Sequence, residues 1–166
     1  MGTTYFAFLR GINVVGRNRV RMSDLRALCT DLGYEDVRTL LNSGNVVFRA
    51  KKATPKELSD ALGGVKVILR TEAELRKVVA NNPFDPVRHP SYLLVMFLDK
   101  SASADTLRDA YGDRGPEIIR GGGREIYIDY VNGVGKSKLS HGYIERVLGV
   151  TATGRNWNTV TRLLTV

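Results

Sequence analysis

The first seventy residues alternate strand-like and helix-like patterns, and this order constrains the fold more than any other feature. The short apolar run Tyr5–Leu9 predicts a buried strand that runs into a polar turn. From Met22 to Leu32 the apolar residues recur at spacings of three and four, which is typical of an amphipathic helix. Ser23 is in the position of an N-cap for that helix, and Gly33 stands where a helix-ending glycine is expected.

Three further strand-like runs and one more helix complete this half. Val37–Leu41 and Val46–Phe48 are joined by glycine and asparagine, which tolerate positive φ, so we expect a tight hairpin. A capping box at Thr54–Glu57 opens a short helix before the strand-like run Val65–Leu69. The resulting order, β-α-β-β-α-β, is that of the ferredoxin-like fold. We therefore predict a ferredoxin-like subdomain over residues 1–70.

The second half, residues 71–166, has a similar order of elements and predicts a second ferredoxin-like subdomain, so the fold class is α+β. A capping box at Thr71–Glu74 opens its first helix. The almost wholly apolar run Tyr92–Leu98 predicts a central strand. A terminal helix stands in the place of a fourth strand. The remaining expected elements are a helix at Ala104–Tyr111, a hairpin of Glu117–Arg120 and Glu125–Tyr130 around three glycines, and helices at Lys138–Leu148 and Asn158–Leu164.

The excess positive charge is confined to the two ends of the chain. The net charge is +8, and residues 1–30 and 131–166 each contribute +4, whereas the residues between them sum to zero. If the two ends meet in space, their fields add and attract anionic partners. The alternative is a basic protein whose surface charge is scattered and has no role in binding.

Composition and cysteine content narrow the class of protein. No apolar run approaches the roughly 20 residues that a membrane-spanning helix needs, and the amino terminus lacks a signal-peptide pattern. The single cysteine, Cys29, lies among leucines at helical spacing and is expected to be a buried core thiol. We therefore expect a cytoplasmic protein with no membrane partner.

A glycine- and lysine-rich stretch follows the last expected strand of the sheet. It reads Tyr-Val-Asn-Gly-Val-Gly-Lys-Ser over residues 130–137, but Tyr130 stands where a nucleoside-triphosphatase phosphate loop requires glycine. A weaker anion site is still expected, because free backbone N–H groups and lysine side chains suit phosphate or carboxylate. Its predicted contacts are Lys136, Ser137 and Lys138. In the alternative interpretation the stretch is a plain connection and Ser137 caps the next helix.

Two polar turns near the amino terminus are further candidates for ligand contacts. Arg10, Gly11 and Asn13 combine a guanidinium group, an exposed backbone and an amide, and arginine can bind phosphate or carboxylate through two parallel hydrogen bonds. The alternative is that Arg10 pairs with an acid while Asn13 holds the turn. The hairpin turn adds three candidates whose side chains are more typical of turn chemistry: Asn42, Ser43 and Asn45.

The stretch Arg155–Thr159 contains the only tryptophan of the chain. Trp157 can stack on a base or ring while Arg155 binds an attached anion, and Asn156 and Asn158 supply further donors and acceptors. The structural alternative is that Trp157 anchors the terminal helix to the core and one of the asparagines caps that helix.

The sequence offers little support for catalysis, a metal or a cofactor. His89 and His141 have no Cys, Asp or Glu at metal-ligand spacing, and no nucleophile can be paired with a base from the order of residues. We therefore predict no metal and no cofactor, and we assign no catalytic residue.

Seven stretches of the chain together resemble a family of uncharacterised bacterial proteins catalogued as domain of unknown function 1697. They are residues 9–13, 22–26, 32–38, 43–48, 82–84, 133–139 and 155–159. They run in the family's order over nearly the whole chain. The resemblance implies two ferredoxin-like subdomains and no established activity. The chain departs from the family pattern at Val15, where glycine is usual, and in a shorter segment between Val47 and Val65.

These observations predict a protein that binds an anionic ligand, nucleic acid or a nucleotide, at a basic surface formed by the two chain ends. One alternative is an enzyme that acts on a small phosphorylated or carboxylated substrate. Another is a structural or interaction protein without a ligand. Salt separates the three, because binding to several phosphates weakens steeply as the salt concentration rises.

Overall fold

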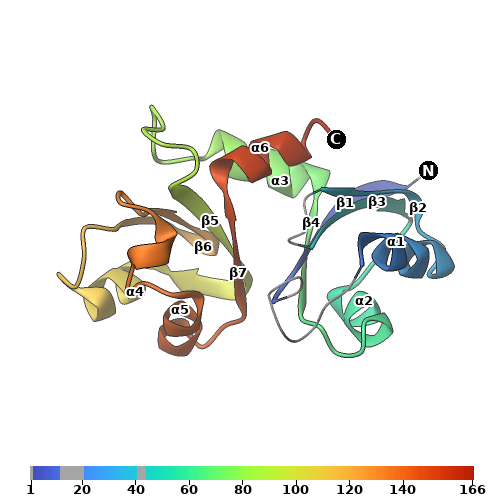
Figure 1. Cartoon of the computed structure of the whole chain (residues 1–166), viewed down its shortest axis with the longest axis horizontal. Coiled ribbons are helices and arrows are strands. Elements are labelled where there is room, and N and C mark those ends of the chain that lie inside the picture. Colours follow the sequence, from blue (N-terminus) through green and yellow to red (C-terminus); the bar gives the residue numbers. More distant parts are fainter. Residues whose placement is uncertain (1, 12–20, 41–43) are drawn as a thin grey trace. The chain divides into compact units, whose positions relative to one another are not determined.

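The computed structural model describes residues 2–11, 21–40 and 44–166. They form a mixed α+β fold with two antiparallel sheets (Figure 1). The chain divides into two compact units, the first made of Met1–Lys77 and Leu163–Val166, and the second of Val78–Arg162. Each unit has its own sheet and its own cluster of buried apolar residues.

The first unit is built on a four-stranded sheet in the order β2-β3-β1-β4, in which all neighbouring strands are antiparallel. The order of its elements along the chain is β-α-β-β-α-β, as predicted. These elements are β1 (Thr3–Leu9), α1 (Met22–Asp31), β2 (Glu35–Leu40), β3 (Asn45–Ala50), α2 (Pro55–Ala61) and β4 (Val67–Thr71).

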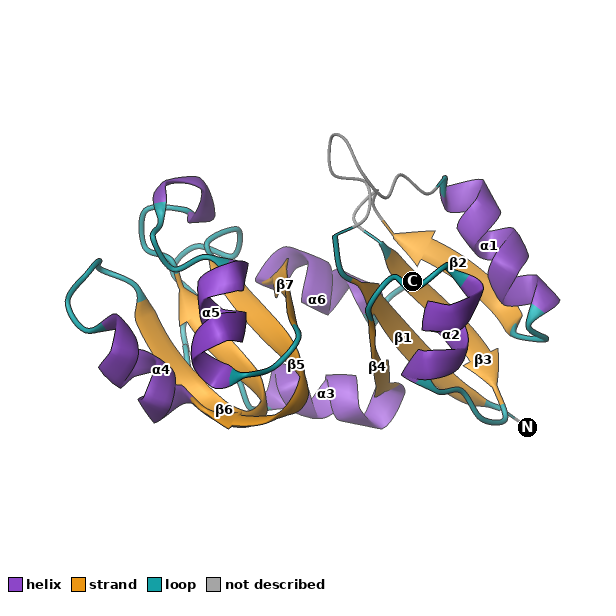
Figure 2. Ribbon diagram, turned by 90° about the horizontal axis from the view of Figure 1, so that it is seen from below, coloured by secondary structure: helices purple, strands orange, loops and turns teal. Residues whose placement is uncertain are grey.

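Alternation along the strands builds the core of this unit. Ala7 and Leu9 of β1 point to one face with Phe48 of β3, and they pack against Leu25 of α1 and Leu58 of α2. Helices α1 and α2 cover that face of the sheet (Figure 2). Burying such side chains contributes roughly 1.5–3 kcal/mol each. The predicted buried thiol, Cys29, belongs to the same cluster, and burial raises its pKa to about 11.

Local capping signals set most of the helix ends in this part of the chain. The Thr54 side chain accepts from the Glu57 backbone N–H, and Thr71 and Glu74 make the two reciprocal hydrogen bonds of a capping box. The prediction for α1 was wrong at its start: the helix begins at Met22, so its N-cap is Arg21 rather than Ser23. Arg21 makes no side-chain cap hydrogen bond, since its side chain has no acceptor to offer the helix.

The second unit contains a three-stranded antiparallel sheet in the order β6-β5-β7, which places the predicted central strand at its centre. Helices α4 and α5 cover one face of this sheet (Figure 2). Helix α3 (Glu72–Ala80) and the end of α6 lead the chain between the two units. The elements are β5 (Leu93–Ser103), α4 (Ala104–Tyr111), β6 (Ile118–Asp129), the 3₁₀ turn η1 (Val134–Lys136), α5 (His141–Leu148), β7 (Ala152–Asn156) and α6 (Trp157–Leu163).

Three predictions about the second unit were wrong. The expected hairpin around Gly121–Gly123 is one continuous strand, β6, whose glycines pair with the end of β5 across a register shift. A strand, β7, precedes the terminal helix where no strand was expected. The helix expected from Lys138 begins at His141, and Ser140 rather than Ser137 caps it by accepting from the Tyr143 N–H.

Among the residues that the structure describes, no helix has the length and apolar character needed to cross a membrane.

Candidate anion-binding site

The candidates of the first unit make mainly backbone contacts. Asn45 is fully buried, and its Nδ2 donates to the Leu40 carbonyl at 3.0 Å, so it closes the connection between β2 and β3. Arg10 is half-buried, and its backbone N–H donates to the Lys66 carbonyl at 2.9 Å. Gly11 is exposed and has a φ of +74°, which favours glycine. The candidates Asn13, Asn42 and Ser43 lie outside the described residues.

Arg155 is a buried cation that belongs to the second unit. It lies on β7, where only 7% of its surface is exposed. Its Nη1 donates to Thr153 Oγ1 at 2.7 Å and to the Gly154 carbonyl at 2.9 Å. Burial lowers the pKa of the guanidinium to about 10, because the charged form loses hydration, and it remains protonated at neutral pH.

The residues that follow Arg155 start helix α6. Asn156 Oδ1 accepts from the Thr159 N–H at 2.9 Å, which makes Asn156 the cap of this helix. The half-buried Trp157 donates its backbone N–H to the Pro90 carbonyl at 3.2 Å. Asn158 is exposed and donates to Ser91 Oγ at 3.2 Å. The capping role is the structural alternative that the sequence left open for this stretch.

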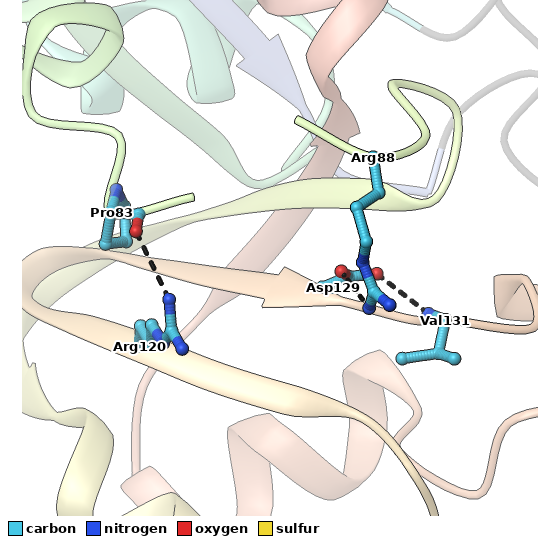
Figure 3. A network of polar contacts seen from close by, with 5 residues as sticks. All are labelled: Pro83, Arg88, Arg120, Asp129 and Val131. Atoms are coloured by element: carbon cyan, nitrogen blue, oxygen red, sulfur yellow. Dashed lines mark hydrogen bonds and ion pairs between the residues drawn. The ribbon is translucent and has the colours of Figure 1, made fainter. Parts of the chain in front are cut away.

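The glycine- and lysine-rich stretch at residues 131–139, which we call the lysine loop, is held at its start by Asp129. One carboxylate oxygen of Asp129 accepts from the Val131 N–H at 2.9 Å, and the other accepts from Arg88 Nη2 at 2.8 Å (Figure 3). Val131 has a φ of +55°, a conformation that costs a β-branched residue free energy. Strained backbone of this kind persists where the surroundings fix it, and Asp129 supplies such a restraint.

The other end of the lysine loop is held by Ser137 and Leu139. Ser137 Oγ donates to Glu117 Oε1 at 2.6 Å and accepts from the Leu139 N–H at 3.0 Å. The side chain of Leu139 is fully buried, and its carbonyl accepts from the Tyr130 hydroxyl at 2.7 Å. The loop therefore has a defined path on both sides of its 3₁₀ turn.

Glu117, which the sequence analysis did not select, is the anionic centre of this anchor. Its Oε2 accepts from the Tyr111 hydroxyl at 2.7 Å while Oε1 accepts from Ser137. Burial acts to raise the pKa of Glu117, but the two hydrogen bonds outweigh it and hold that pKa below its usual value. Glu117 and Ser137 lie 20 residues apart, and no local pattern in the sequence connects them.

The two lysines of the loop are exposed to solvent, unlike its anchoring side chains. Lys136 and Lys138 are exposed, and neither ammonium group makes an ion pair with any described residue. They flank Ser137, whose acidic partner Glu117 is also bound by Tyr111. The structure thus brings the three candidates of this stretch together on one anchored loop, with two unpaired positive charges.

An aromatic pair adjoins the lysine loop. Gly133 has a φ of +94°, and a Cβ added there would lie 3.4 Å from the Tyr92 ring. The exposed ring of His89 stacks on Tyr92, with centroids 3.8 Å apart and planes at 7°. Lysine side chains, the exposed ring of His89 and the glycine backbone at Gly133 therefore occur within one short region of the second unit.

Comparison with known families gives one match that covers most of the chain. A family model described as "Protein of unknown function (DUF1697)" matches residues 2–127. The chain belongs to this family. The match contains Glu117 and both residues of the aromatic pair, while the lysine loop and Arg155 follow its last residue. No curated protein matches the chain.

A solved structure shares the fold of this DUF1697 protein. It is described as "the structure of conserved bacterial protein SP0830 from Streptococcus pneumoniae", and it superposes with a TM-score of 0.75 at 22% sequence identity. The similarity covers 99% of this chain and 98% of the other. At this identity the likeness establishes the fold alone.

The described residues contain no group of three or more His, Cys, Asp or Glu side chains that could hold a metal ion. The lysine loop itself provides two ammonium groups, a serine hydroxyl bound to a carboxylate, and backbone N–H groups.

Proposed function

We propose that this protein binds an anionic ligand, nucleic acid or a nucleotide, through the lysine loop of its second unit. Lys136 and Lys138 contact phosphate groups, and Ser137 positions them through its hydrogen bond to Glu117. Arg155 does not contact the ligand, because its guanidinium is buried. Arg10 belongs to the first unit and is not required for this surface.

The observation that carries the proposal is the contrast between the fixed backbone of the loop and its unpaired charges. An exposed lysine on a mobile segment loses side-chain and backbone entropy when it binds. Here Asp129 and Glu117 already fix both sides of the loop, so less entropy remains to be lost. Preorganised cations that make no ion pair among the described residues favour an anionic partner.

The aromatic pair supports a ligand that contains bases. The outer face of His89 offers a flat surface, already held parallel to Tyr92, on which a base can stack. Arg88 lies beside it, with its side chain 62% exposed although it is paired with Asp129. Stacking next to phosphate contacts is the usual combination in proteins that bind single strands.

Further positive charge surrounds the anchor of the loop. Tyr111, a partner of Glu117, packs edge-on against Tyr143 with ring centroids 5.9 Å apart. The guanidinium groups of Arg114 and Arg146 lie over the Tyr143 ring at 5.9 and 5.5 Å. Both arginines are exposed, so they extend the basic surface beyond the two lysines.

Fluorescence anisotropy with labelled single-stranded and duplex oligonucleotides tests the proposal. We expect binding at about 50 mM salt that weakens by an order of magnitude or more at about 200 mM. The double variant Lys136→Ala/Lys138→Ala should weaken binding. It should also reduce the slope of log affinity against log salt concentration by the equivalent of about one to two phosphate contacts. The matched control is Lys77→Ala/Lys100→Ala, which removes the same charge from exposed lysines outside the loop.

Two results would overturn this function. One is an absence of binding to either oligonucleotide at low salt. The other is equal weakening by the two double variants, since a general effect of net charge does not depend on where the lysines lie. Single-stranded oligonucleotides should bind more tightly than duplexes if His89 stacks a base, and His89→Ala should remove that preference.

A second candidate function is an enzyme that acts on a small phosphorylated or carboxylated substrate. The observation that favours it is the 2.6 Å hydrogen bond between Ser137 and Glu117, which pairs a hydroxyl with a carboxylate. The lowered pKa of Glu117 weakens it as a base near neutral pH, and this favours binding over catalysis. Turnover of a phosphate ester that Glu117→Gln abolishes, while oligonucleotide binding persists, would establish the enzyme instead.

We also infer that residues 1–70 and 71–166 each form a ferredoxin-like subdomain. The first unit supports this with its β-α-β-β-α-β order and its antiparallel sheet β2-β3-β1-β4. The second unit has one strand fewer, in the order β6-β5-β7. Its long β6 occupies the sequence of both strands expected there.

A further inference from the structure

The first unit contains an open hollow of about 710 Å³ that the lysine loop does not involve. It lies between the turn after α1, the start of β2, the end of β3 and the start of α2. Its size is within the range of small-molecule sites in proteins, about 300–1,000 Å³. The stretch at residues 32–38, by which the chain resembles its family, contributes Leu32, Gly33, Tyr34 and Glu35 to the lining.

Three cations line this hollow. Arg49 belongs to β3, and Lys51 and Lys52 follow that strand directly. All three side chains are exposed, and none makes an ion pair with a described residue. Arg49 stands opposite Glu35 in the pairing of β2 and β3, yet their charged groups do not meet. Positive charge is therefore available on the β3 side of the hollow.

The opposite side of the hollow offers a fixed acceptor. Tyr34 is buried and stacks on Phe48, with ring centroids 4.2 Å apart and planes at 6°. Its hydroxyl donates to Glu57 Oε1 at 2.6 Å, while the Glu57 backbone N–H is held by Thr54. Among the described residues, Glu57 Oε2 has no hydrogen-bond partner. One carboxylate oxygen is thus free to accept from a ligand.

We propose that this hollow binds a small organic phosphate that also carries hydroxyl or amino donors. Arg49, Lys51 and Lys52 contact the phosphate, for which a guanidinium fork and two ammonium groups are suited. Glu57 accepts from a donor on the rest of the ligand. The two acids of the hollow, Glu35 and Glu57, oppose a bare anion, so an organic phosphate binds more tightly than inorganic phosphate.

Titration of the ¹⁵N-labelled full-length protein, followed by amide chemical shifts, tests this site with three probes: ribose 5-phosphate, ribose and inorganic phosphate. We expect saturable shifts with ribose 5-phosphate at Gly33, Tyr34 and the amides of residues 50–52. Inorganic phosphate should bind more weakly at the same amides, and ribose should not bind measurably. Because the readout is local, it does not depend on binding by the lysine loop.

Variants assign the two ends of the ligand. Lys51→Ala/Lys52→Ala should weaken ribose 5-phosphate by about tenfold or more, since it removes charge-assisted contacts. Glu57→Gln should lower the affinity for ribose 5-phosphate, because it removes the carboxylate that accepts from the ligand. It should raise the affinity for inorganic phosphate, because it removes a negative charge. Lys77→Ala/Lys100→Ala, which removes two exposed lysines outside both sites, is the control and should leave both affinities unchanged.

Three results would overturn the proposal. The first is an absence of saturable shifts around the hollow up to about 10 mM ribose 5-phosphate, which is a weak limit for a specific site. The second is an affinity for inorganic phosphate equal to that for ribose 5-phosphate. The third is an unchanged affinity for ribose 5-phosphate in Lys51→Ala/Lys52→Ala. Loss of oligonucleotide binding in the lysine-loop variant with these shifts intact would show that the two sites are separate. Thermal melting of each variant confirms that these exposed substitutions leave the protein folded.

Discussion

The lysine loop and the stretch Arg155–Thr159 resemble one another in sequence but differ in their environments. Each places positive side chains next to glycine or asparagine near a helix start. In the lysine loop, Lys136 and Lys138 are exposed and have no acidic partner among the described residues. In the other stretch, Arg155 is buried and Asn156 caps a helix. Cations beside flexible residues therefore do not by themselves identify an anion site.

The secondary structure that carries each stretch explains the difference. Arg155 belongs to β7, and strand alternation places it on the face opposite to Gly154. Gly154 packs so tightly that an added Cβ would lie 2.6 Å from Met96 Sδ. The lysine loop belongs to no strand, and its anchors, Ser137 and Leu139, turn inward while its lysines are exposed. The contrast can be tested by substitution, and the largest effect is expected in the strand.

Replacement of the buried arginine should have the largest effect on stability. Arg155→Ala removes the hydrogen bonds to Thr153 and Gly154 and the volume of a buried side chain, so the free energy of unfolding should fall by about 3 kcal/mol. Arg155→Lys should recover only part of this loss, because an ammonium cannot reproduce the planar fork. Urea denaturation measures the difference.

The control for this substitution is Arg146→Ala, which removes an exposed arginine from the same unit. It should change the free energy of unfolding by less than about 0.5 kcal/mol. If Arg155→Ala proves equally mild, Arg155 is not an internal structural cation, and it returns to the set of residues that can contact a ligand.

The sequence predicted those elements whose signals are local. The capping box at Thr71 and the helix Ala104–Tyr111 depend on residues within one or two turns of each other, and both were confirmed. Of the box predicted at Thr54–Glu57 only the Thr54 cap forms, because the Glu57 side chain accepts from Tyr34 instead. Strand β7 was missed because Ala-Thr-Gly-Arg-Asn has no apolar alternation, and its strand state comes from pairing with the distant β5.

The same reasoning explains the errors around the candidate site. Three consecutive glycines suggested a turn, but they lie within β6, where Gly122 and Gly123 pair with Ser103 and Ala102 of β5 beyond a register shift. Ser137 was a candidate ligand contact or a helix cap, and its bond to Glu117 could not be seen because the two residues meet only in the folded chain. Local chemistry identified the lysine loop, whereas its anchors required the structure.

The anchor of the lysine loop should contribute less to stability than Arg155. Ser137→Ala removes both the hydrogen bond to Glu117 and the acceptor of the Leu139 N–H, so the free energy of unfolding should fall by about 1–2 kcal/mol. Affinity for oligonucleotides should fall as well, because Lys136 and Lys138 are no longer positioned. Ser140→Ala, which removes the cap of α5, is the control that should destabilise the protein without this loss of affinity.

Glu117 should give the anchor a dependence on pH. Its pKa is lowered in the folded protein, so its stabilising effect is complete above the ordinary value of 4.5 and is lost as the pH falls through the folded pKa. The free energy of unfolding of the wild type should therefore exceed that of Glu117→Gln at pH 7, and the gap should narrow below about pH 4.5. A gap that stays constant down to pH 3 would show that Glu117 does not anchor the loop through its charge.

The smallest effect on stability is expected for the lysines themselves, and it completes the contrast with Arg155. Since Lys136 and Lys138 are exposed and have no ion pair among the described residues, Lys136→Ala/Lys138→Ala should leave the free energy of unfolding within about 0.5 kcal/mol of the wild type. A slight increase in the free energy of unfolding is expected, because the loss of two positive charges reduces the repulsion among the cations of the carboxy-terminal end.

Oligonucleotide affinity should nevertheless fall in this double variant. Arg155→Ala, by contrast, should destabilise the protein but leave the oligonucleotide affinity of its folded fraction unchanged. A double variant that unfolds as easily as Arg155→Ala would mean that the lysines stabilise the fold, and the two stretches would then differ in exposure but not in role.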